Sequence, residues 1–308
     1  MRGSAIHIVG AVVAVGGLAV APVVLQNSYL TGVLTVCVIY AIWASSWDFM
    51  SGLTGRENFG HALFIGTGAY TAGFLSASFY YSPWLSLPSS VVVAVVFSIL
   101  VGLPTLRLRG PYFALAMLSS AAIMQRLALI FWEYTGGEEG LYGIEPLLDT
   151  PLHFYWFALG VMVVTVAVLL ALAKSRWGVI LRAIRGDEAS CMAAGINTTF
   201  YKIAALSISA AFAGLGGALY AHYQLQVSPQ LFAVVTTITV IIMAYVGGLG
   251  SIYGAAGAAI LLTLLTELLR DFGEWRLWVY TSILIFILFF LPNGLIAPVW
   301  ERLTGARR

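Results

Sequence analysis

Three long stretches of the chain, at 3–47, 58–106 and 203–266, carry no aspartate, glutamate, lysine or arginine. A membrane-spanning helix needs about 20 apolar residues, so each stretch is long enough for two or three. Lipid offers no partner to an unpaired backbone N–H or C=O group, and the backbone inside such stretches is therefore expected to be helical. A membrane β-barrel would alternate polar and apolar residues over segments of about 10 residues, a pattern that these continuous runs lack.

The apolar runs divide into ten predicted spans of an all-α, polytopic transmembrane helical bundle. They lie near 5–25, 29–50, 60–80, 85–106, 111–131, 152–173, 200–223, 229–247, 251–270 and 277–297. We expect the eighth and ninth spans to be broken or tilted, because they are short and rich in glycine. The first run has some features of a signal peptide, with Arg2 ahead of it and Ala-Val-Ala at 19–21. Its length, and Pro22 directly after that tripeptide, favour a membrane helix.

The basic residues of the loops predict the orientation of these helices. The loop at 174–188 carries four basic residues, whereas the loop at 132–151 carries five acidic residues and no basic one. Short loops rich in lysine and arginine stay in the cytoplasm. We therefore place 174–188 in the cytoplasm and 132–151 outside, with one span between them. With ten spans, the N-terminus and the C-terminus are then both cytoplasmic.

Composition supports a membrane protein. Of the 308 residues, 60% are hydrophobic and only 9% are charged, against about 25% charged residues in soluble domains. So few charges cannot cover a water-exposed surface, which excludes a soluble domain. The net charge of +2 gives no indication of a nucleic-acid partner. Cys37 lies in a predicted span and Cys191 in a predicted cytoplasmic loop, so we expect no disulfide between them.

The sequence contains no motif that is typical of an enzyme. Its four histidines lie on different segments and do not suggest a metal site, and no cofactor is expected. The phosphate-binding motif Gly-x-x-x-x-Gly-Lys-Ser/Thr is absent, so any ATP-driven work needs another chain. Asp48 and Arg126 are the ionisable residues nearest to the membrane core. An ion-coupled carrier usually places acids in the middle of its spans, so their scarcity argues against that class.

The stretch at 178–197 is too polar to span a membrane and predicts a short helix. Gly186 ends one helical segment, Asp187 is a good N-cap for a second, and Glu188 sits favourably in its first turn. Gly195 can supply the left-handed residue that ends a helix. A helix of about seven residues is not stable alone, so it must pack on something. Two interpretations stay open, a docking helix for a cytoplasmic partner and an interfacial helix against the bilayer.

Glycine-rich segments at 53–69 and 249–258 resemble each other faintly. Transporters are often built from two related halves. Glycine-rich helix ends also look alike by chance, so both a true internal repeat and a coincidence stay open.

Five segments carry a resemblance to a known family, in the same order and at similar spacing. They are 52–69 with Asn-Phe-Gly-His at 58–61, 106–114 with Arg-Gly-Pro-Tyr-Phe-Ala at 109–114, 182–197, 209–220 and 246–254. Together they resemble the Liv-type branched-chain amino-acid permeases over roughly residues 30 to 297. Each motif is weak alone, and the set of five in order is strong.

The resemblance implies that residues 1–308 form a single transmembrane permease domain of an ATP-driven importer in the bacterial inner membrane. In it, 174–199 is the coupling loop, on which two cytoplasmic ATP-binding subunits dock. A second, related permease subunit pairs with the chain as a heterodimer, and a periplasmic binding protein delivers the substrate. The residues expected at the ATPase contact are Arg182, Ala183, Arg185, Asp187, Glu188, Ala193 and Gly195.

The implied substrates are branched-chain or similar small amino acids. Related permeases of the same superfamily carry urea, amides or aromatic acids, which remain the alternative. Arg56 and Glu57 stand where relatives have glutamine and an apolar residue. We expect this pair to satisfy itself at the start of a helix. The residues of the substrate path are not identified by the sequence.

Overall fold

The computed structural model describes residues 2–108, 110–270, 282, 285 and 294–298. The predicted tenth span, at 277–297, lies mostly outside the described residues, as does the end of the chain. The longer helices are α1 (Arg2–Leu25), α2 (Ser28–Thr54), α3 (His61–Ala77), α4 (Pro83–Thr105), α5 (Pro111–Ile130), α7 (Pro151–Lys174), α10 (Thr198–Gln224), α11 (Val234–Gly247) and α12 (Ile252–Leu268). The shorter elements are α6 (Trp132–Thr135), α8 (Arg176–Gly186), α9 (Glu188–Ala193), the 3-10 helix η1 (Pro229–Phe232), and the antiparallel strands β1 (Leu141–Tyr142) and β2 (Gln226–Val227).

Local sequence signals set several helix ends. The Asn27 side chain accepts hydrogen bonds from the first backbone N–H groups of α2, and the Thr150 side chain does the same for α7. Proline occupies the first turn of α4, α5 and α7, where its missing N–H costs nothing. Gly55 ends α2 in the left-handed conformation, with φ of 70°.

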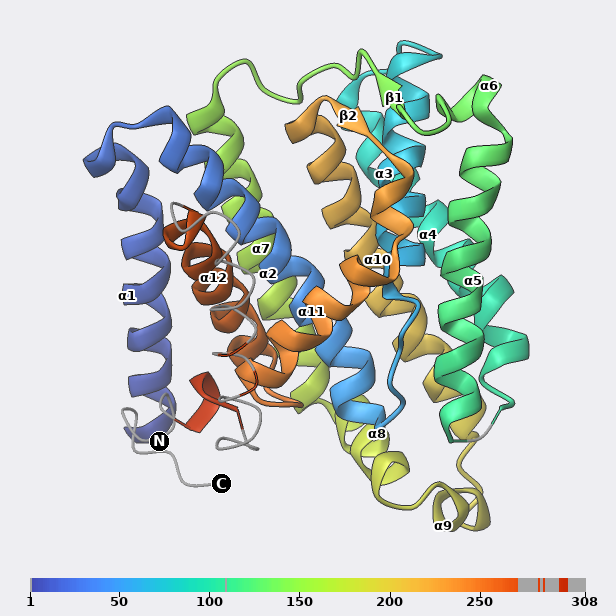
Figure 1. The fold of residues 1–308 in the computed structure, drawn as a ribbon. Coiled ribbons are helices and arrows are strands. Elements are labelled where there is room, and N and C mark those ends of the chain that lie inside the picture. The colour runs from blue at the N-terminus through green and yellow to red at the C-terminus, as the bar shows by residue number, and fades with distance from the viewer. Residues whose placement is uncertain (1, 109, 271–281, 283–284, 286–293, 299–308) are drawn as a thin grey trace.

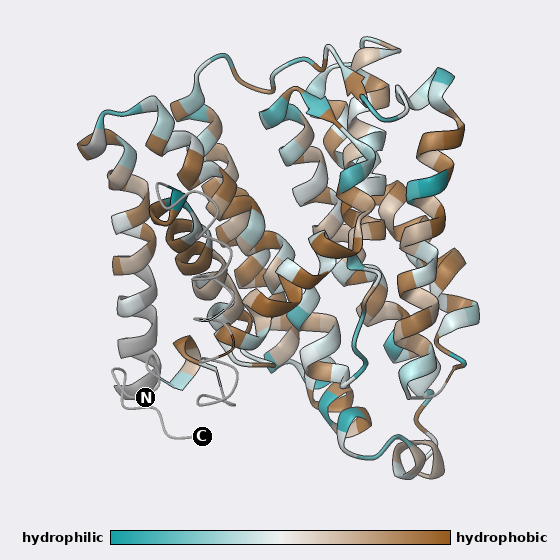
Figure 2. Cartoon of the chain, in the orientation of Figure 1, coloured by the Kyte–Doolittle hydropathy of each residue, from teal (hydrophilic) through white to brown (hydrophobic). Residues whose placement is uncertain are grey.

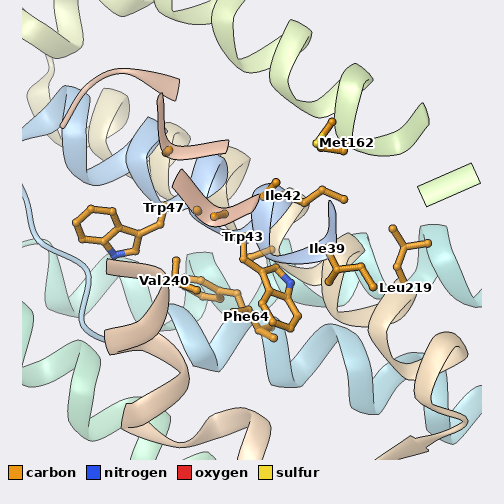
Figure 3. Close-up of a cluster of buried hydrophobic side chains, with 14 of the residues drawn as sticks. Ile39, Ile42, Trp43, Trp47, Phe64, Met162, Leu219 and Val240 are labelled. Atoms are coloured by element: carbon orange, nitrogen blue, oxygen red, sulfur yellow. The ribbon is translucent and has the colours of Figure 1, made fainter. Parts of the chain in front are cut away.

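Helix α2 forms the centre of the bundle (Figure 1). In its most apolar window 72% of the residues are buried, against 22% for α5. Its side chains Ile39, Ile42, Trp43 and Trp47 meet residues of α3, α7, α10 and α11 in one apolar cluster (Figure 3). Small residues allow the closest helix contacts: a Cβ at Gly68 would lie 2.4 Å from the Cα of Gly214.

The prediction of an all-α bundle with several spans is confirmed. In the described part of the chain, α2, α4, α5, α7 and α10 are long and apolar enough to cross a membrane. Helices α11 and α12 have 14 and 17 residues and meet at an angle of 116° across a short break. This agrees with the expectation that the eighth and ninth spans are broken or tilted. The total of ten spans stays a prediction.

Two groups of loops lie at opposite ends of the bundle. Helices α8 and α9 lie at the lower end in Figure 1, and α6, β1 and β2 lie at the upper end. Hydrophobic residues colour most of the helices brown, and α8 shows teal residues at its end of the bundle (Figure 2). The separation of 174–188 from 132–151 therefore agrees with a single span between them. Which end faces the cytoplasm stays a prediction.

Candidate functional site

The loop between α7 and α10 folds into two short helices by local capping. The Ser175 side chain accepts a hydrogen bond from the backbone of α8, and Gly178, Leu181 and Ile184 bury one face of this helix. The Asp187 carboxylate accepts hydrogen bonds from the backbone N–H groups of Ala189 and Ser190, at 2.9 and 3.2 Å. The predicted N-cap is therefore confirmed, and so is the end of α8 at Gly186.

Helix α9 has six residues and ends as the sequence predicts. Gly195 has φ of 82°, in the left-handed region. Its N–H donates to the carbonyl of Met192, and the N–H of Ile196 donates to the carbonyl of Cys191, both at 3.0 Å. This pair of bonds satisfies carbonyl groups at the end of α9 that have no partner inside the helix.

Glu188 ties α9 to two membrane helices. Its Oε2 lies 2.6 Å from Nη2 of Arg56, just after α2, and its Oε1 lies 2.5 Å from Nζ of Lys202 in α10. The hydroxyl of Thr198 also donates to Oε1, at 3.1 Å. Burial opposes ionisation of Glu188, but the hydrogen bonds and charges of Lys202 and Arg56 outweigh it and lower its pKa to about 2.

The pair Arg56–Glu57 does not satisfy itself as expected. Arg56 pairs with Glu188, and Glu57 accepts a hydrogen bond from the hydroxyl of Tyr245 in α11, at 2.6 Å. The expectation was wrong because the fold brings Glu188 of α9 and Tyr245 of α11 next to this segment. Each side chain therefore finds its partner on a different element.

Arg185 ties α8 to the place where α2 meets the α11–α12 break. Its Nη1 donates to the carbonyl of Gly52 at 2.5 Å. The N–H of Gly250, in the break, donates to Oδ1 of Asp48 at 2.7 Å. A Cβ at Gly52 would lie 2.6 Å from the backbone nitrogen of Gly250, so the two backbones touch. Gly52, directly before the glycine-rich segment at 53–69, thus touches the glycine-rich segment at 249–258.

Of the seven residues expected at an ATPase contact, three bind other elements of the bundle. Arg185 and Glu188 do so as described above. All of the seven except Glu188 are exposed: Arg182, Ala183, Arg185, Asp187, Ala193 and Gly195. Arg182 donates to the carbonyl of Ala173 at the end of α7, at 2.8 Å. Hydrogen bonds from the Ser190 hydroxyl and from backbone N–H groups lower the pKa of Asp187, which stabilises its charged form as a cap.

Sequence reasoning missed residues on both sides of this loop. On its outer surface, Val179 and Met192 are 57% and 50% exposed, and they add apolar area beside Ala183 and Ala193. On the inner side, the partners Arg56 and Lys202 were not identified. The exposed apolar residues could have been found from the amphipathic pattern of α8, whereas the ionic partners depend on the tertiary fold.

Helix α3 begins inside the bundle, after the irregular segment at 55–60. The indole N–H of Trp47 donates to the carbonyl of Asn58 at 2.8 Å, and Nε2 of His61 lies 3.2 Å from the hydroxyl of Ser46. Ser46 lies eight residues before the end of α2 at Thr54, which is about 12 Å along the helix at 1.5 Å per residue. Measured along the axis of α2, the first turn of α3 therefore lies about 12 Å further inside the bundle than the end of α2 at Thr54.

Helix α11 begins beside the start of α3. The hydroxyl of Thr237, in the first turn of α11, accepts a hydrogen bond from the backbone N–H of Ala62 at 2.9 Å. Upstream of α11, Phe232 stacks on Tyr70 of α3 with ring centroids 5.5 Å apart. Helices α3 and α11 thus both start inside the bundle, and a hydrogen bond joins their first turns.

The sequence matches a known protein family. The family is described as "Branched-chain amino acid transport system / permease component", and the match covers residues 29–291. The chain is 31% identical over 293 residues to the high-affinity branched-chain amino acid transport system permease protein LivM of Salmonella typhimurium, covering 86% of this chain and 69% of that protein. It is 22% identical to a probable branched-chain amino acid transport permease protein LivM of Methanocaldococcus jannaschii, covering 84% and 90%.

A relative that matches a shorter part of the chain has a different name. The nucleoside ABC transporter permease protein NupC of Lactococcus lactis is 26% identical over 185 residues, covering 56% of this chain and 57% of that protein. No solved structure matches the chain significantly.

Proposed function

Because the chain belongs to the family of permease components of branched-chain amino acid transport systems, we propose that it is the membrane subunit of an ATP-driven importer of branched-chain or similar small amino acids. It would work in the bacterial inner membrane as a single transmembrane domain over residues 1–308. Its partners would be a second, related permease in a heterodimer, two cytoplasmic ATP-binding subunits and a periplasmic binding protein. ATP hydrolysis would take place on the ATP-binding subunits.

The observation that carries this proposal is the two-sided coupling loop at 174–199. Its outer surface exposes the small side chains of Ala183 and Ala193 and the apolar side chain of Met192, to which an ATP-binding subunit could pack closely. Its inner surface is fastened by Arg185 and Glu188 to α2, α10 and the α11–α12 break. A movement of a docked subunit would therefore be passed on to several membrane helices at once.

The substrate assignment follows the relatives named as branched-chain amino acid permeases. The nucleoside permease covers a smaller share of the chain than either of them, 56% against 86% and 84%. Urea, amides and aromatic acids remain the alternative cargo. Selection among solutes would rest mainly with the binding protein, which releases its ligand onto this chain.

Reconstitution tests the proposal. The chain is assembled in proteoliposomes with a second permease, ATP-binding subunits and a binding protein from the same organism. We expect leucine, isoleucine or valine to stimulate ATP hydrolysis and to accumulate inside, with uptake lost when the binding protein is omitted. Uptake of only urea or an aromatic acid would overturn the amino-acid assignment. Uptake that is driven by an ion gradient without ATP would overturn the importer class.

A further inference from the structure

The 55–60 segment, η1 and α11 lie on the side of the bundle that faces the viewer in Figure 1, and several of their residues are polar. Polar residues that are at least partly exposed come from these elements and from α5: Glu57, Ser119, Gln230, Thr236 and Thr239. These elements are neighbours, because α5 contacts η1 and α11, and Tyr245 of α11 binds Glu57. We call this set the polar face.

The lipid-facing helices have a different surface. Between residues 91 and 103 of α4 the exposed side chains are all apolar, namely Val92, Val96, Ile99, Leu100 and Leu103. On α7, Val164 and Val168 are exposed in the same way. Such residues suit hydrocarbon, whereas five polar side chains on one side of the bundle do not.

The backbone beneath the polar face is also unsuited to lipid. Non-helical backbone at membrane depth is tolerated only where protein buries it or where it lines a water-filled cavity. The segment at 55–60 has no regular secondary structure, and the one at 228–233 contains only the single-turn 3-10 helix η1. The first leads into α3, whose first turn lies about 12 Å from the end of α2, and the second leads into α11, which is hydrogen-bonded to that turn. Beside the first turn of α3, Nδ2 of Asn58 and Nδ1 of His61 are buried and find no hydrogen-bond partner among the described residues.

Building on the proposed function, we propose that the polar face lines the path by which an amino-acid zwitterion crosses the membrane. The chemistry of the face matches both charges of such a solute. The N-terminal turn of α11, where Val234 and Thr236 are partly exposed and Val235 is exposed, favours a carboxylate. The carboxylate of Glu57 suits the ammonium group. The apolar side chains Val235 and Ile238, exposed on the same helix, suit an aliphatic side chain.

Cysteine accessibility in the assembled complex tests this path. The two native cysteines are replaced by alanine, and single cysteines are placed at Thr236 and Thr239 of the path and at Val96 and Val164 of the lipid surface. A thiol in hydrocarbon has a pKa raised by more than one unit, so its reactive thiolate is at least about tenfold less abundant than in water. We expect a small cationic methanethiosulfonate to react about tenfold faster or more at the two threonine positions than at the two valine positions.

Replacing one residue of the path and one of the lipid surface with tryptophan provides a second measurement. Thr239→Trp should reduce ATP-driven uptake about tenfold or more, while Val96→Trp leaves uptake near the wild-type rate, with both complexes assembling equally. Equal thiol reactivity at the four positions, or full uptake by the Thr239→Trp complex, would overturn the path. Either result leaves the proposed function standing, because that function fails only if the unmodified complex shows no ATP-driven uptake of amino acids.

Discussion

Replacing Glu188 with glutamine is the sharpest test of how the coupling loop is fastened. The substitution keeps the size of the side chain and removes the charge that faces Arg56 and Lys202. The Lys202 side chain is only 3% exposed, so its ammonium group would be left with a neutral partner at a site shielded from water. We expect a less stable complex that hydrolyses ATP without responding to substrate.

The loss of stability expected from Glu188→Gln is estimated from the pKa of Glu188 and from its burial. The pKa of Glu188 falls from its ordinary 4.5 to about 2, and at about 1.4 kcal/mol per pKa unit this corresponds to about 3 kcal/mol in favour of the charged carboxylate. Breaking a buried pair costs about 3–5 kcal/mol and breaking an exposed one about 0–1 kcal/mol. The Glu188 side chain is 23% exposed, so we expect Glu188→Gln to cost about 2 kcal/mol.

The assay compares variants of the assembled complex in lipid nanodiscs. Thermal unfolding reports stability, and ATP hydrolysis with and without loaded binding protein reports coupling. Glu133→Gln, which alters an exposed acid at the opposite end of the bundle, is the control. In the double variant Glu188→Gln/Lys202→Met the buried cation is gone, so stability should recover while coupling stays impaired. If Glu188→Gln matches the wild type in both measurements, the carboxylate does not fasten the loop.

Four further predictions concern the same loop and its orientation. A cysteine at exposed Glu138 should react with an impermeant thiol reagent outside spheroplasts, and one at Gly186 should not; the reverse pattern would invert the topology. Gly195→Val should strain the left-handed turn by about 1 kcal/mol or more and abolish substrate-stimulated ATP hydrolysis, whereas Gly186→Ala, which meets no atom within 4 Å, should not. Arg185→Met removes the hydrogen bond to a main-chain carbonyl of α2 and should uncouple hydrolysis from uptake without dissociating the complex; full coupling would remove this residue from the proposal. The stability that Glu188 contributes, measured as the difference from Glu188→Gln in thermal unfolding, should be complete above pH 4.5 and decline as the pH falls towards 2, because its pKa is lowered in the folded state; a difference that stays constant between pH 6 and 3 would contradict this.

The membrane helices, the ends of α9 and the break between α11 and α12 could be predicted from the sequence, because each depends on interactions between residues close together in the chain. A run of about 20 residues without charge has one stable form in lipid, so the all-α bundle followed from the apolar stretches alone. The caps of α9 were equally predictable, because Asp187 and Gly195 act on backbone groups only two to four residues away. The break between α11 and α12 was signalled by glycine for the same local reason.

The tertiary structure decided which way the loop's charged side chains point and where the broken helices begin. Glu188 meets Arg56 across 132 residues, and Arg185 meets Gly52 across 133, distances over which sequence spacing carries no information. Hydropathy also could not show that 55–60 runs back along α2, because an apolar segment reads the same whether its helix starts at the surface or about 12 Å inside. Both outcomes depend on helices packing closely enough for distant backbones and charges to meet, and only the folded bundle supplies that contact.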